Sequence, residues 1–141
     1  MTTELVRGSA VYIDANVFIY FVERTPDFFD KARALFTALA EGEARVLTSE
    51  LTVAECLFHP ARNGNIRLVS VYERFFDPEG DVRLIPLTGA VAKQAAQAGG
   101  SWGLKLLDAI HYVSALESGC TAFVTADSRF RSGPALKVVR V

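Results

Sequence analysis

Two aspartates follow short apolar stretches of the kind that form buried β-strands. Asp14 comes directly after Val11-Tyr12-Ile13, and Asp127 comes two residues after the stretch 122–125. Ligands of open parallel sheets bind beyond the carboxyl ends of the strands. We therefore expect both carboxylates to project toward the same edge of one sheet. Taken singly, Asp14 could instead cap a helix and Asp127 could belong to a turn.

Two further acids have apolar neighbours within helical patterns. Glu55 follows Leu51, Val53 and Ala54, and Asp108 lies in the first turns of a helix whose other face-forming residues are apolar. Each could be an ion-paired helix residue, because charged side chains are rarely buried without a partner. Their positions near helix starts also allow them to reach the sheet edge where Asp14 and Asp127 are expected.

Four converging carboxylates would repel one another, or one of them would keep a proton. A hard divalent cation resolves this conflict, since Mg²⁺ or Mn²⁺ prefers oxygen ligands together with waters and substrate phosphates. Without the four acids, the chain has 15 basic and 12 acidic residues (16 less 4), so the remaining surface can be mildly basic. The candidate phosphate contacts are Arg62, Arg67, Arg74, Lys93, Lys105, Arg129 and Arg131.

The elements that must position these acids alternate between strands and helices, which predicts a parallel sheet covered on both faces. Pro60 and the pair Gly99-Gly100 are expected to end the helices that precede them. Ser49 or Thr52 is expected to cap the helix that carries Glu55. The predicted strands are 11–13, 45–48, 82–87, 122–125 and 136–141, and the predicted helices are 28–41, 49 or 52 to about 58, 66–76, 90–98 and 104–117.

Length and composition limit the classes of protein to which this chain can belong. Leu, Ile, Val and Phe make up 44 of 141 residues and the net charge is −1, which excludes a disordered chain and predicts one domain over residues 1–141. The longest uncharged apolar run near the start, residues 17–22, is far shorter than the roughly 20 residues of a membrane span. Cys56 and Cys120 form no metal-ligand pattern and are expected to be reduced and buried, as in a cytoplasmic protein.

Four segments together resemble the motifs of PIN-domain nucleases, and the compact length resembles the VapC-type toxins of toxin–antitoxin pairs. The resemblance runs from about residue 11 to residue 130. Each segment alone is a weak signal, whereas four in order, each at its expected strand or helix, are fairly specific. The segments are Val11-Tyr12-Ile13-Asp14-Ala15-Asn16, Leu51-Thr52-Val53-Ala54-Glu55, Leu106-Leu107-Asp108-Ala109-Ile110 and Val124-Thr125-Ala126-Asp127-Ser128-Arg129-Phe130.

The resemblance implies a three-layer α/β/α sandwich with a central parallel sheet of four to five strands, and metal-dependent cleavage of RNA. It implies Mg²⁺ or Mn²⁺ as cofactor, a cognate antitoxin as inhibitor and a homodimer. The residues carried over as the catalytic metal site are Asp14, Glu55, Asp108 and Asp127, with Asn16 and Thr125 as supporting polar residues. His111 is expected to be a packed or capping residue rather than a ligand.

Two other classes of protein remain as alternatives. A PIN-like binding module without activity would keep the fold and bind no metal. A receiver-type phosphoacceptor domain would need an aspartate after the third strand, where Leu87-Thr88-Gly89 stands instead. Its phosphoacceptor site would also not require an aspartate within a helix, where Asp108 lies.

Overall fold

Five parallel strands form the centre of the fold. The computed structural model describes residues 8–133 and 135–141. The strands are β1 (Ala10–Ile13), β2 (Arg45–Ser49), β3 (Val82–Ile85), β4 (Ala122–Thr125) and β5 (Lys137–Arg140), in the spatial order β3-β2-β1-β4-β5. Every neighbouring pair is parallel. The predicted parallel sheet is confirmed, and β3 lies at one of its edges.

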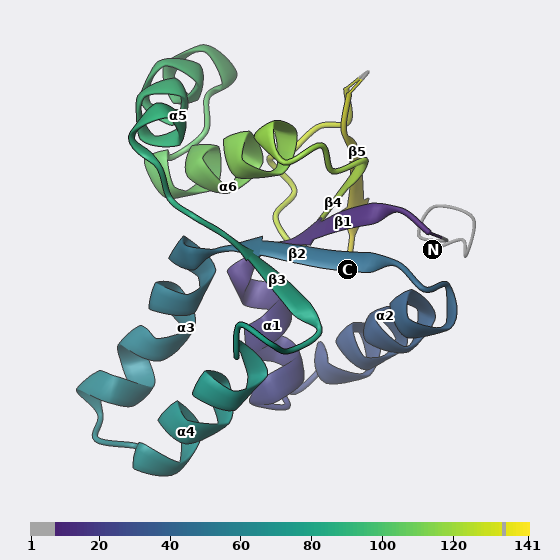
Figure 1. The fold of residues 1–141 in the computed structure, drawn as a ribbon, viewed down its shortest axis with the longest axis vertical. Helices are drawn as coiled ribbons and strands as arrows, with labels where there is room; N and C mark the ends of the chain where they lie inside the picture. The colour runs from purple at the N-terminus through teal and green to yellow at the C-terminus, as the bar shows by residue number, and fades with distance from the viewer. Residues whose placement is uncertain (1–7, 134) are drawn as a thin grey trace.

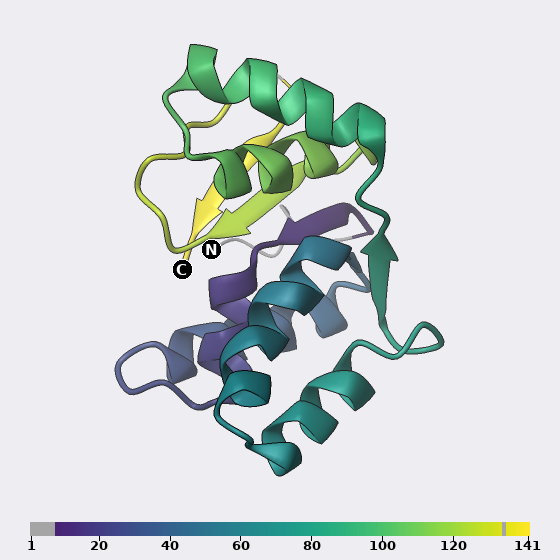
Figure 2. The ribbon, with the colours of Figure 1, turned by 90° about the vertical axis from the view of Figure 1, so that its left-hand side faces the viewer.

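Helices cover both faces of this sheet, as Figures 1 and 2 show. One layer contains α1 (Ala15–Val22), α2 (Phe29–Glu41), α3 (Glu50–Arg62) and α4 (Ile66–Phe75). The opposite layer contains α5 (Gly89–Trp102) and α6 (Leu106–Glu117). The three-layer α/β/α sandwich is therefore confirmed. The segments described hold no helix that is both long and apolar enough to cross a lipid bilayer.

Strand β1 shows why this sheet must be covered twice. Val11 and Ile13 are fully buried in the core under α1 to α4, whereas Tyr12 is fully buried in the core under α6. Successive strand residues point to opposite faces, so an unbroken apolar run requires partners on both. Cys56 and Cys120 are buried and free, as predicted.

Helix α1 was not predicted, although its residues were recognised as an apolar run. It is apolar on all sides, with Ala15, Val17 and Phe18 buried and Ile19 to Val22 half-buried. Periodicity cannot separate such a run from a buried strand. The helix matters for the site because it begins directly after Asp14.

Two predicted helix ends were wrong. Helix α3 continues two residues past Pro60, which is buried, and the Asn63 N–H closes its last turn on the carbonyl of His59. Proline removes one N–H donor, and near a helix end that loss is small. Helix α5 continues through Gly99, which is buried because the helix packs closely on α6, and a Cβ there would lie 3.4 Å from that of Ala109. The helix ends at Gly103, whose φ of 68° suits glycine.

The strand order places a switch point beside β1. The chain leaves β1 toward β2 and β3, then returns through α5 and α6 to β4 on the other side of β1. Neighbouring strands whose connections leave in opposite directions open a crevice at their carboxyl ends, where ligands bind. Receiver-type domains have the order 2-1-3-4-5 instead, so the observed order contradicts that alternative.

Candidate acidic site at the switch point

Asp14 occupies the carboxyl end of β1 at this crevice. Its backbone N–H donates to the carbonyl of Val124 at 3.1 Å, which ties it to β4, and the residue is only 8% exposed. It is the first residue before α1, but its side chain makes no capping hydrogen bond. A capping hydrogen bond of good geometry is therefore absent, although the backbone N–H of Val17 in the first turn of α1 still acts to lower the pKa of the Asp14 carboxyl. Among the described residues, its Oδ1 is the one buried side-chain polar atom without a hydrogen-bond partner.

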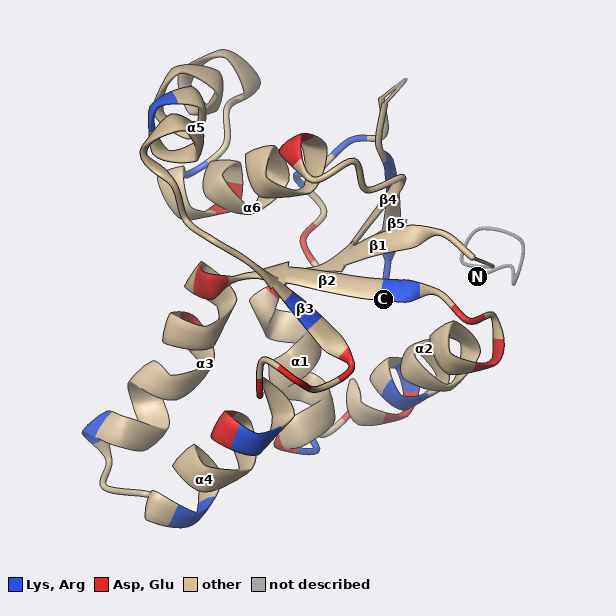
Figure 3. Cartoon of the chain, viewed as in Figure 1, with Lys and Arg blue, Asp and Glu red and all other residues tan. Residues whose placement is uncertain are grey.

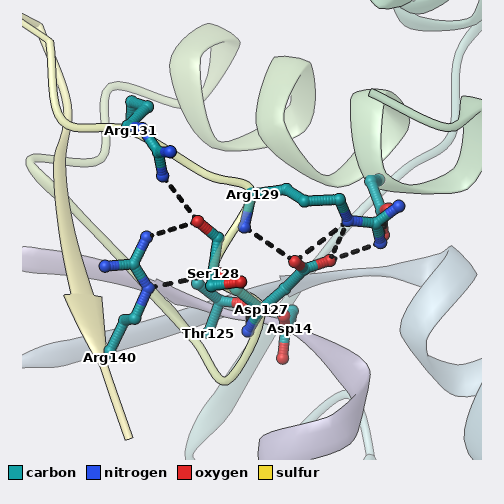
Figure 4. Close-up of polar contacts among 8 residues, drawn as sticks. Asp14, Thr125, Asp127, Ser128, Arg129, Arg131 and Arg140 are labelled. Carbon is teal, nitrogen blue, oxygen red and sulfur yellow. Dashed lines mark hydrogen bonds and ion pairs between the residues drawn. The ribbon is translucent and has the colours of Figure 1, made fainter. Parts of the chain in front are cut away.

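Thr125 connects Asp14 to Asp127. The Thr125 hydroxyl donates to Oδ2 of Asp14 at 2.5 Å and accepts from the backbone N–H of Asp127 at 2.9 Å (Figure 4). A fully buried threonine at the end of β4 thus fixes one carboxylate and the start of the next loop. This is the geometry that the predicted supporting role of Thr125 requires. Asn16 is exposed in the first turn of α1, and its side chain forms no hydrogen bond within the part of the chain described.

Arg129 lies between two of the predicted acids. Its guanidinium donates to Oδ2 of Asp108 at 2.8 Å. It also donates to both carboxylate oxygens of Asp127, as Figure 4 shows. The Asp127 carboxylate also accepts the Arg129 backbone N–H at 2.9 Å, which is the turn expected of an aspartate at this position. The ion-pair interpretation of Asp108 is therefore correct in this structure, and the bridge brings together acids that lie 19 residues apart in sequence.

Glu55 is held by a buried histidine of α6 rather than by Arg129. Nε2 of His111 lies 2.6 Å from Oε1 of Glu55, and Nδ1 lies 2.6 Å from the hydroxyl of Tyr12. Because a carboxylate only accepts, Nε2 must carry the proton. His111 is 4% exposed and packed, as expected, but it also orients Glu55. Its position three residues after Asp108 puts both on one face of α6, a signal that the sequence contained.

The pKa values of the acids follow their surroundings. Burial raises the pKa of Asp14 from its ordinary 3.8 to about 6, against the opposing effects of the Thr125 hydrogen bond and the nearby His111. Burial also raises the pKa of Asp108, although Arg129 opposes it. The hydrogen bonds from Arg129 lower the pKa of Asp127. Negative charge is therefore least tolerated at Asp14, the residue that has no cationic partner.

The arrangement only partly matches a metal site. Across residues 8–133 and 135–141, no three Asp, Glu, His or Cys side chains are grouped closely enough to hold one ion. Asp108 and Asp127 face Arg129 instead, and Glu55 faces His111. The free buried oxygen of Asp14 nevertheless fits a cation, because an unpartnered carboxylate oxygen in a buried site needs a positive charge or a donor. All-oxygen donors suit Mg²⁺ or Mn²⁺.

The sequence match decides the family. Residues 11–135 match the model of the PIN domain. The chain belongs to the PIN domain family. No curated protein matches this PIN domain.

Several solved structures share the fold of this PIN domain at low sequence identity. A toxin–antitoxin complex from Klebsiella pneumoniae is 16% identical over 89% of this chain and 94% of its own, with a TM-score of 0.69. DNA-bound VapBC from Salmonella typhimurium is 16% identical over 94% of this chain and 98% of its own, also at 0.69. VapC20 from Mycobacterium tuberculosis, a Sarcin-Ricin loop cleaving toxin, is 14% identical over 80% of this chain and 86% of its own, with a TM-score of 0.67. The likeness to these proteins is one of fold.

Arg129 supplies a test of whether the acids of this PIN domain bind a metal. Replacing Arg129 by Gln removes the cation from Asp108 and Asp127, so Mn²⁺ should bind about two- to fivefold more tightly, the range expected for a half-exposed ion pair. Isothermal titration calorimetry measures this. Arg131→Gln is the matched control, because the Arg131 guanidinium donates only to the carbonyls of Ser128 and Phe130. Equal Mn²⁺ affinities for the two variants would contradict a metal site at these carboxylates.

Proposed function

We propose that this chain is a metal-dependent endoribonuclease and the toxin of a toxin–antitoxin pair. The observation that supports this most directly is the buried, unpartnered Oδ1 of Asp14 at the switch point of a PIN domain. The fold neighbours include a toxin–antitoxin complex and a Sarcin-Ricin loop cleaving toxin, which favours the same function here.

Asp14, Asp108 and Asp127 would hold the cation, with Glu55 completing the site directly or through water. When bound, Mg²⁺ or Mn²⁺ lowers the pKa of a coordinated water toward 7 and offsets the charge that develops on the phosphate. The hydrogen bond from Thr125 would hold the Asp14 carboxylate in place for the ion, and the contact with His111 would do the same for Glu55. In-line attack of water on the phosphodiester would leave a 5′-phosphate and a 3′-hydroxyl.

Positive charges beside the acids would bind the substrate backbone. Lys105 lies close enough to Asp127 to lower its pKa, and Arg129 is 42% exposed above the two aspartates. Figure 3 shows further basic residues along the segment that leads into β5 and in β5 itself. Phosphate contacts of this kind give affinity without sequence preference. Which RNA is cut would depend on its shape and its single-stranded loops.

The function is tested by incubating the purified protein with total RNA in Mn²⁺ and in chelator. We expect cuts that depend on the metal, and sequencing of RNA 5′ ends after brief induction in cells should locate them. The alternative, an inactive PIN-like binding module, predicts no Mn²⁺ binding and no new 5′ ends. Measured Mn²⁺ affinity separates the two.

We propose that a hollow lined by phenylalanines is the binding site of the antitoxin. The sequence contains two adjacent aromatic pairs, Phe28-Phe29 and Phe75-Phe76. Phe76 is buried, Phe75 is half-buried, and neither member of the first pair is fully buried. Phe21, Phe29, Phe36 and Phe75 line a hollow of about 640 Å³ between α1, α2 and α4. Arg24 and Arg33 lie over the Phe29 ring at 5.4 and 5.7 Å, so the hollow suits an apolar segment with acidic flanks.

Replacing Phe29 by Ser should weaken the complex with the cognate antitoxin by about tenfold or more, because a buried aromatic contributes roughly 1.5–3 kcal/mol. Affinity for the antitoxin and the mass of the dimer in solution are the measurements. Phe28→Ser is the matched control, since Phe28 stacks on Tyr20 at 4.5 Å and does not line the hollow. If both variants keep wild-type affinity and mass, the hollow is neither the antitoxin site nor a dimer contact.

A further inference from the structure

Besides the phenylalanine-lined hollow, the structure has a pocket that lies immediately beside the acidic site. It is a pocket of about 440 Å³ between α5, α6 and the loop that leads into β5. Its volume is within the range of about 300–1,000 Å³ typical of small-molecule sites. The residues that define its character are Trp102, Tyr112, Phe130, Leu136, Arg129 and Arg131.

The pocket wall is aromatic and partly open to solvent. Trp102 is 47% exposed and lies edge-on to Tyr112 at 5.2 Å. Tyr112 in turn stacks on buried Phe130 at 5.8 Å, with 11° between the ring planes. This stack holds the Tyr112 ring, and through it the Trp102 indole, in fixed positions. A large exposed ring on a rigid support can bind a flat aromatic ligand by stacking.

The loop that closes the pocket is fixed by two arginines. Arg131 Nη1 donates to the carbonyl of Ser128 at 2.6 Å, and Arg140 Nη2 donates to the same carbonyl at 2.8 Å and to that of Phe130 at 2.7 Å. Figure 4 shows both guanidinium groups on the Ser128 side of the loop, opposite the acids. The side of the pocket formed by residues 128–131 is therefore fixed within the protein itself, and the pocket rim is basic.

Arg129 belongs to both features. Its side chain lines the pocket, while its guanidinium bridges Asp108 and Asp127 in the acidic site. If Arg129 held a phosphate, the group attached on one side of that phosphate would lie over the acids. The group attached on its other side would lie in the aromatic pocket. The chemistry that fits both is a nucleotide, with its anionic phosphate at the arginine and its flat base on the rings.

We propose that this pocket binds one nucleobase of the RNA strand, stacked on Trp102, next to the phosphate that is cut. The proposal rests on the proposed nuclease function, to which it adds a subsite. Base stacking on aromatic side chains is the usual means of holding single-stranded RNA. The pocket accommodates one flat ring system, whereas a stable protein–protein interface buries roughly 800 Å² on each side; a second copy of the chain is therefore kept as an outcome of the test.

Trp102 is the single tryptophan of the chain, so its fluorescence reports on the pocket directly. The first experiment uses wild-type protein in chelator, with a hexamer of adenosine nucleotides and an abasic hexamer of the same phosphate count. We expect the adenine hexamer to quench Trp102 and the abasic hexamer to leave its emission unchanged. Equal quenching by both, or by neither, would overturn the proposal. A change of emission with protein concentration alone would assign the pocket to a second copy and also overturn it.

The second experiment compares Trp102→Leu with Phe58→Leu in RNA cleavage with Mn²⁺. Phe58 is the matched control, because it is an aromatic residue 58% exposed on α3 and does not line the pocket. Stacking is worth roughly 1–3 kcal/mol per base, so Trp102→Leu should raise KM about tenfold or more, with melting temperatures confirming that both variants fold. Cleavage with equal KM for both variants would remove the base pocket and leave the nuclease standing. If no variant cleaves RNA, the nuclease proposal fails, and the hexamer comparison in chelator still decides the pocket.

Discussion

Replacing Asp14 by Asn is expected to abolish RNA cleavage while the fold stays intact. The amide keeps the shape of the carboxylate but loses the charge at the buried oxygen that has no other partner. Thr125 can still donate to the remaining oxygen, so the local hydrogen bond is preserved. A loss of at least about a hundredfold in rate, or about 3 kcal/mol of transition-state stabilisation, should be seen at saturating Mg²⁺.

Asp30→Asn is the control for this variant, because Asp30 is an exposed acid on α2 whose nearest cation, Arg33, lies 3.9 Å away. It should retain wild-type activity. If Asp14→Asn keeps roughly a tenth or more of the wild-type rate, Asp14 is not a metal ligand. Circular dichroism and melting temperature establish that any loss of rate is not a loss of fold.

The same substitution should raise stability when no metal is present. In chelator at pH 7.5, Asp14→Asn is expected to melt above wild type, because the ionised carboxylate is buried without a cation. The rise in the pKa of Asp14 to about 6 corresponds to an upper bound of about 3 kcal/mol. Because the amide of Asn also brings N–H donors that need acceptors, we expect the free energy of unfolding to rise by about 1–3 kcal/mol. Each kcal/mol moves Tm by roughly 2–8 °C in a domain of this size.

The pH dependence of this effect has a defined sign. The folded state binds a proton at Asp14 more tightly than the unfolded state does, because its pKa is raised on folding. That contribution to stability is complete below about pH 4 and is lost as pH rises through about 6. The stability difference between Asp14→Asn and wild type should therefore grow between pH 4 and pH 6 and stay constant above it.

Asp108→Asn is the informative comparison in the same melting series. If four carboxylates converged without cations, replacing any one of them by its amide would stabilise the fold. Arg129, however, already balances the charge of Asp108. The gain in Tm for Asp108→Asn in chelator should therefore be smaller than for Asp14→Asn. With millimolar Mn²⁺ the differences in Tm between each variant and wild type should narrow or reverse, because wild type is stabilised by the free energy of Mn²⁺ binding. A lower Tm for Asp14→Asn in chelator, with no Mn²⁺ shift in wild type, would rule out the metal site.

Most of the sheet could be predicted from the sequence because its strands are short apolar runs bounded by polar residues. Asp14 and Asp127 could be placed at one edge for the same reason, since residues that end parallel strands share an edge. The order β3-β2-β1-β4-β5 could not be predicted from these runs. Strand order depends on how the helices pack on each face, and apolar strands do not encode that individually.

Helix limits were less well predicted where packing overrides local signals. Gly99-Gly100 normally ends a helix, yet α5 continues because Gly99 lets it approach α6 closely. Helix α1 went unpredicted because a run that is buried on all sides has no amphipathic period to detect.

The sequence by itself determined the chemical character of the site, and the tertiary structure decided its electrostatics. Four acids with apolar neighbours indicated an acidic centre, because such residues are rarely plain solvated charges. Only the fold shows that Arg129 bridges Asp108 and Asp127 and that His111 reaches Glu55 across 56 residues. It also shows that one carboxylate oxygen of Asp14 is buried without a hydrogen-bond partner. The physical reason is that pairing and burial depend on distances between side chains of different elements, and these distances exist only after the sheet and its two helical layers have packed.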